Sequence, residues 1–138
     1  MGAQTVRMRP DGFLYYQISI WNMLHPISGT SAFTDWNPRS WTTYHGDGSW
    51  TCCGPDGMPL PTVRLENFRD GLEDYVYALE LERRLMAAPS APWSARAREL
   101  LAVPKDVMVS MTEYTTDSAK LYAWRNAIAD LIEESDVK

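Results

Sequence analysis

Long apolar runs are missing from this sequence of 138 residues. Their absence argues against a protein that spans a membrane. A helix that crosses a bilayer needs roughly 20 consecutive apolar residues, and no run approaches that length. The first ten residues, MGAQTVRMRP, also lack the apolar stretch of a secretory signal peptide. We expect no membrane partner and a chain long enough for one domain with a hydrophobic core.

Clustered positive charge is missing as well. The 13 Lys and Arg residues are scattered along the chain, and the formal net charge is −5. Proteins that bind nucleic acid neutralise its phosphates with basic patches or stripes. The charge pattern therefore predicts no nucleic-acid partner.

Cysteine and histidine are scarce, with two of each. Cys52 and Cys53 are adjacent and could form a strained vicinal disulfide, but two reduced thiols in a turn or small strand fit better. His25 and His45 lack the spacing of metal ligands, and we interpret both as structural or solvent-exposed. Glycine signatures of phosphate loops, dinucleotide folds and serine hydrolases do not occur either. The sequence thus predicts no metal site and no cofactor.

Aromatic residues are abundant instead, with six Trp and seven Tyr. Several lie within 22–61, a stretch rich in Gly and Pro that predicts a long loop, and such loops usually carry function. Flat aromatic faces in a loop suit the apolar faces of sugars, although the same rings could form core. The candidate substrate-binding residues are Trp21, Asn22, Tyr44, Asp47 and Trp50.

Asp47 lies between two glycines, so it is either an acid presented to a ligand or part of a tight turn. No other residue pattern in the loop indicates catalysis. We name no catalytic residue in this chain.

The spacing of apolar residues and the flanking prolines predict one long helix over 62–86. Pro61 and Thr62 mark its start, Pro89 follows its end, and apolar residues recur every three or four positions. The predicted buried face consists of Leu65, Phe68, Leu72, Val76 and Leu79.

The opposite face of this helix is densely charged. It carries Arg64, Glu66, Arg69, Asp70, Glu73 and Asp74. Paired carboxylates can cleave glycosidic bonds, but acids interleaved with arginines are more often a structural ion-pair face. Because some of these acids repel one another at i,i+4 spacing, we expect them to bind an Arg or backbone N–H of another element. Gly71 predicts a close approach by another backbone.

The remaining segments give shorter predictions. Residues 12–21 are aromatic and β-branched, which predicts a largely buried strand, and a second short strand is expected over 49–53. Residues 94–101 predict a short helix capped by Ser94, and 107–111 a strand or extended connection. A last helix is expected from Thr116 or Asp117 to about Glu134. The chain divides into 1–61, 62–86 and 87–138 within one domain or fragment.

A family resemblance follows from particular residues. Residues 12–16 (GFLYY), 21–22 (WN), 46–48 (GDG) and above all 64–77 (RLENFRDGLEDYVY) resemble the C-terminal part of the catalytic domain of glycoside hydrolase family 123. This bacterial family is also catalogued as a domain of unknown function. Residues 51–54, TCCG, depart from the family, where a Tyr-Pro-Gly-like string is usual.

The resemblance implies a (β/α)8 barrel that removes N-acetylgalactosamine-type sugars by a substrate-assisted mechanism. The family's catalytic acids are an adjacent Asp-Glu pair, and this sequence has no Asp-Glu dipeptide. A barrel also needs about 200 residues or more. The expected fold class is therefore α/β, the C-terminal portion of a barrel with one or two strands, which is helix-dominated as a stand-alone chain.

Two main hypotheses follow. The chain is either part of a β-N-acetylgalactosaminidase-like hydrolase that lacks the catalytic pair, or a non-catalytic carbohydrate-binding or helical interaction module. A small helical structural protein without a ligand is a third. The expected partners are an N-acetylhexosamine-type glycan and either an upstream barrel half or a second copy of the chain. The resemblance suggests a bacterial protein, periplasmic or secreted through a signal located upstream.

Overall fold

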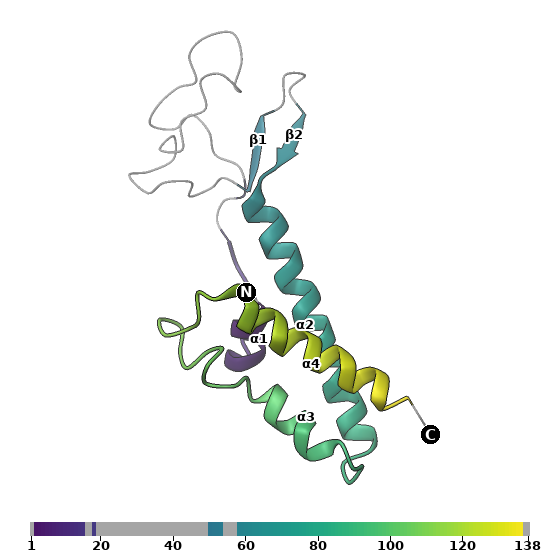
Figure 1. Ribbon diagram of the computed structural model, residues 1–138. Helices are drawn as coiled ribbons and strands as arrows, with labels where there is room; N and C mark the ends of the chain where they lie inside the picture. The colour runs from purple at the N-terminus through teal and green to yellow at the C-terminus, as the bar shows by residue number, and fades with distance from the viewer. Residues whose placement is uncertain (1, 16–17, 19–49, 54–57, 137–138) are drawn as a thin grey trace, which may run out of the picture. The chain divides into compact units, whose positions relative to one another are not determined.

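The computed structural model describes residues 2–15, 18, 50–53 and 58–136, and most of them are helical (Figure 1). Their elements in chain order are α1 Gly2–Met8, β1 Thr51–Cys53, β2 Pro59–Pro61, α2 Val63–Ala87, α3 Ser94–Leu101 and α4 Ser118–Glu134. The chain forms two compact units, one of Met1–Asp11 with Asp70–Lys138 and one of Gly12–Arg69. The expectation of a helix-dominated chain is confirmed.

The strands β1 and β2 form an antiparallel ribbon in the second unit. Their register pairs Thr51 with Pro61 and Cys53 with Pro59. The strand expected over 49–53 is thus confirmed at 51–53, whereas β2 was predicted as loop. Proline cannot donate a hydrogen bond to a strand ladder and is found in edge strands. Because β2 begins and ends with proline, strand propensity did not predict it. Thr62 fastens the ribbon to α2 by donating its backbone N–H and its hydroxyl to the Trp50 carbonyl, at 2.9 and 3.0 Å.

The strand expected over 12–21 is wrong wherever the structure describes it. Residues 12–15 and 18 belong to no strand, and the other positions lie outside the described residues. The Ile18 carbonyl accepts hydrogen bonds from Trp50 and Thr51 at 3.1 and 3.4 Å, but these contacts do not continue as a ladder over 12–15. The side chains of Phe13 and Tyr15 pack on other rings instead.

The long helix α2 has nearly the predicted bounds but buries another face. Leu72, Val76 and Leu79 are 43%, 61% and 41% exposed, so the predicted apolar face is wrong in this part of the helix. The buried positions are Gly71, Asp74, Ala78 and Leu81. Small residues in this row let other backbones come close.

Helix α1 was not predicted, since seven residues are too few for a helix that is stable alone. Ala3 and Val6 are buried in the core and hold it. A Cβ added at Gly2 would lie 2.7 Å from the Gly71 carbonyl oxygen, which no real side chain tolerates. Gly71 therefore has the close backbone neighbour that the sequence predicted.

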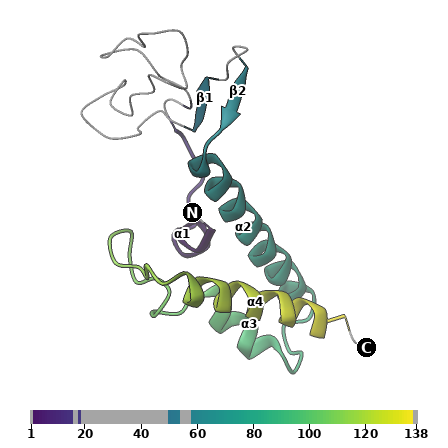
Figure 2. The same ribbon diagram turned by 45° about the horizontal axis from the view of Figure 1, so that its top comes forward.

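Helices α3 and α4 lie side by side and complete the first unit (Figures 1 and 2). Both predicted ranges are confirmed. Asp117 caps α4 through a hydrogen bond of 2.9 Å from the Ala119 N–H. Ser94 does not cap α3, because it is the first helical residue and its hydroxyl donates to the Ala88 carbonyl instead.

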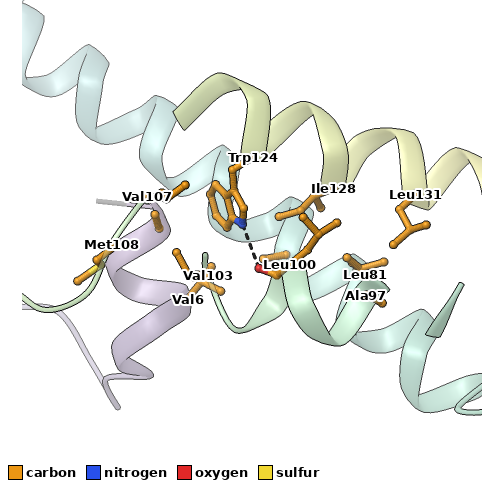
Figure 3. Close-up of a cluster of buried hydrophobic side chains, with 12 residues drawn as sticks. Val6, Leu81, Ala97, Leu100, Val103, Val107, Met108, Trp124, Ile128 and Leu131 are labelled. Carbon is orange, nitrogen blue, oxygen red and sulfur yellow. Dashed lines mark hydrogen bonds between the residues drawn. The ribbon is translucent and has the colours of Figure 1, made fainter. Parts of the chain in front are cut away.

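The core of the first unit joins all of its helices (Figure 3). Leu81, Ile128 and Leu131 are almost fully buried, and the indole N–H of Trp124 donates to the Leu100 carbonyl at 3.0 Å. Val103 follows α3 with φ of 54°, a position where glycine is usual. Burial of its side chain offsets that strain.

The connection between α3 and α4 is largely irregular. Met108 and Tyr114 form an isolated antiparallel bridge, so the segment predicted as a strand or extended connection is mostly a connection. None of the described helices combines the length and the apolar character that a bilayer crossing demands.

Candidate functional site

An aromatic cluster in the second unit contains the one candidate sugar-binding residue that the structure describes, Trp50. Its ring stacks on Tyr15 at 4.4 Å between centroids, with an angle of 16° between the planes. Phe68 from α2 packs on the same indole at 4.4 Å and 38°. Phe13 completes the cluster, 5.0 Å from Phe68 and 6.3 Å from Trp50. Four rings from three chain segments thus meet at one point.

The positions of these residues in the chain explain why the four rings come together. Trp50 directly precedes β1, and its carbonyl is fixed by Thr62 at the start of α2. Phe68 lies on the second turn of α2, six residues beyond Thr62. Phe13 and Tyr15, two residues apart, both contact the indole.

The cluster combines buried and exposed aromatic surface. Phe13 is 55% exposed, while Tyr15, Trp50 and Phe68 are half-buried. Trp50 already contacts several rings, so it supports the cluster more than it offers an open platform. The Phe13 ring, next to the strongly exposed Leu14, provides the accessible apolar surface.

Sequence reasoning named Trp50 but missed its neighbours. Phe13 and Tyr15 were assigned to a strand, and Phe68 to a buried helix face. The signal was present in the dense aromatic run of residues 13–16, FLYY. Trp21, Asn22, Tyr44 and Asp47, like His25 and His45, lie outside the described residues.

The charged residues of α2 fall into two groups. Glu66 and Arg69 form an ion pair of 2.6 Å on the surface, and Arg64 is exposed in the first turn. Asp70 is half-buried and Glu73 is exposed. Surface pairs of this kind contribute little to stability, about 0–1 kcal/mol.

Asp74 differs because it is buried against α1 and α4. Arg125 of α4 places Nε 3.2 Å from Asp74 Oδ1 and Nη2 3.8 Å from Glu73 Oε2. The guanidinium also lies 5.6 Å from the Tyr77 ring centroid, at cation–π distance. Arg125 is the arginine from another element that the repulsion among the α2 acids predicted. Nothing in the local sequence of α4 identified it.

Glu66, Glu73 and Asp74 each pair with an arginine. General acid–base chemistry on a sugar needs two carboxyl groups facing a shared cleft. Within the described ranges, no three or more His, Cys, Asp or Glu side chains gather as metal ligands would. The arrangement fits a structural role.

Comparison with known proteins gives no match for this chain among family models, curated proteins or solved structures. The resemblance to the glycoside hydrolase family therefore rests on the residues 12–16, 21–22, 46–48 and 64–77 alone.

Proposed function

We propose that the chain binds carbohydrate through the aromatic cluster of Phe13, Tyr15, Trp50 and Phe68, without cleaving it. The observation that supports this is a half-exposed Phe13 ring that packs on Phe68 and Trp50. Sugars present apolar C–H faces to aromatic rings, and a ring fixed by its neighbours loses little entropy on binding. The exposed face of Phe13, backed by the other rings, therefore suits one face of a pyranose.

The sugar class comes from the family resemblance. We propose an N-acetylhexosamine, with N-acetylgalactosamine as the first ligand to test. In this proposal the chain is the C-terminal portion of a (β/α)8 barrel of the glycoside hydrolase type, in which it contributes a sugar subsite and scaffold. The catalytic Asp-Glu pair would belong to an upstream half.

Binding can be tested by calorimetric titration of the chain with N-acetylgalactosamine. We expect weak affinity, with Kd on the order of 1 mM, and a loss of at least about fivefold on Phe13→Ala, which corresponds to about 1 kcal/mol. Tyr122→Ala, which removes a similarly exposed ring from α4, is the matched control and should not change the affinity. Equal binding by all three proteins would contradict the proposal.

Hydrolysis provides a separate test. Because the chain lacks the catalytic dipeptide, we expect no turnover of a chromogenic N-acetyl-β-galactosaminide. Co-expression with a barrel half that carries an Asp-Glu pair should restore it. Turnover by the chain alone would contradict the assignment of catalysis to an upstream half, but it would not contradict sugar binding by this chain.

A helical interaction module is the second candidate. The exposed row Leu72, Val76, Leu79 and Met86 on α2 favours it, since apolar residues at helical spacing commonly meet another helix. A second copy of the chain is the partner proposed here. A dimer in sedimentation experiments, together with no heat in the sugar titration, would favour this function over the first.

A further inference from the structure

We propose that Asp74 is a proton-operated latch whose neutral form holds α1 on α2 more firmly than its ionised form. This inference is independent of the sugar-binding proposal. It rests on Asp74, a residue that is only 7% exposed where α1, α2 and α4 meet.

The packing around Asp74 leaves little room for water. A Cβ added at Gly2 would lie 2.5 Å from the Asp74 Cβ and 3.1 Å from its Oδ2. The start of α1 therefore lies directly against this side chain, and Gly2 is the residue that permits the contact. Any change in how well the carboxyl group tolerates burial acts on the same contact.

The ionised carboxylate is incompletely satisfied there. Oδ1 is buried, and among the described residues no donor is aligned to hydrogen-bond it. Arg125 Nε lies within ion-pair distance at 3.2 Å, but proximity without alignment yields only part of the energy of a charged hydrogen bond. Arg125 is also shared with the exposed Glu73. An uncharged Asp74 would avoid this cost.

Burial and the neighbouring charges shift the pKa of Asp74 in opposite directions. Burial raises the pKa of Asp74 above its ordinary value of 3.8, Arg125 and the amino terminus ahead of α1 lower it, and Asp70 and Glu73 raise it again. A carboxyl group with a raised pKa stabilises the fold fully below its unfolded pKa. That contribution is lost as the pH rises through the folded pKa. The latch is accordingly closed in acid and weakened towards neutral pH.

Amide hydrogen exchange in α1 tests the latch on the full chain. The comparison is between wild type and Asp74→Asn, which mimics the neutral acid, with Asp130→Asn as the control, the same substitution at an exposed position of α4. At neutral pH we expect the opening of Val6 and Met8 amides to be faster in wild type than in Asp74→Asn, by about tenfold for each unit of raised pKa. The opening rates of wild type and Asp74→Asn should converge at acidic pH, and Asp130→Asn should follow wild type.

Faster α1 opening in Asp74→Asn at every pH would overturn the proposal and make Asp74 a simple stabilising ion pair. Should the Asn variant fold poorly, wild type alone provides the test. The Asp74 carboxyl carbon must then titrate in NMR with a midpoint above 3.8, and α1 protection must fall with that same midpoint. Different midpoints would also overturn it.

Discussion

Trp124 connects α4 to α3 through both its ring and its indole nitrogen. The ring is 3% exposed and the N–H donates to the Leu100 carbonyl. That carbonyl also accepts from the Val103 N–H at 3.1 Å, so it keeps one partner when the indole is removed. Trp124 therefore contributes to stability through its packing and through one hydrogen bond.

Trp124→Phe should lower the free energy of unfolding by about 1–3 kcal/mol, because it removes the hydrogen bond and part of a buried ring. Urea denaturation followed by circular dichroism measures this. Tyr122→Phe, on the exposed side of α4, should stay within about 0.5 kcal/mol of wild type. If both substitutions have the same small effect, the core does not depend on Trp124.

At the scale of elements, α2 shows what hydrophobic periodicity can and cannot predict. Its bounds follow from Pro61 and Pro89, which interrupt helices for steric reasons. Its buried face does not follow, because the row of Gly71, Asp74, Ala78 and Leu81 is less apolar than the row of Leu72, Val76 and Leu79. Close approach by α1 at Gly71 determined the face, and α1 has no sequence signal of its own.

Two leucines of α2 distinguish the faces directly. Leu81→Ala should cost about 2–5 kcal/mol, since this side chain is 0% exposed and leaves a cavity. Leu79→Ala, two residues earlier and 41% exposed, should cost less than about 1 kcal/mol. Thermal or urea unfolding of both variants gives the comparison, and the reverse order would show that the predicted face is the buried one after all.

Electrostatics link the end of α2 to the end of α4. Arg84 donates to Glu80 at 2.7 Å and to the Ile132 carbonyl of α4 at 2.9 Å. Hydrogen bonds from Arg83 and Arg84 lower the pKa of Glu80 to about 2. The contribution of this group to stability is present above its unfolded pKa and is lost as the pH falls towards 2. Acidification therefore removes the contribution of Glu80 to stability, whereas it adds that of Asp74. The two residues must be tested separately.

At the scale of the whole molecule, the helix-dominated character and the order of α2, α3 and α4 were predictable, whereas α1 and β2 were not and the site was only partly so. Proline positions and the Asp117 cap defined α2 and α4. The aromatic cluster needed tertiary information, because Phe13 and Phe68 are 55 positions apart in sequence (68 − 13) and no local rule joins them. The same holds for Arg125 and Asp74, which meet only once α4 packs on α2.

In the proposed function the rings around Trp50 bind a sugar, and the decisive measurement is NMR observation of those rings during titration with N-acetylgalactosamine. We predict saturable shifts of the Phe13 and Trp50 ring protons with a common Kd, while Trp124 in the core of the other unit stays unchanged. Unchanged Phe13 and Trp50 signals at ligand concentrations well above about 10 mM, where such weak sites are nearly filled, would contradict it.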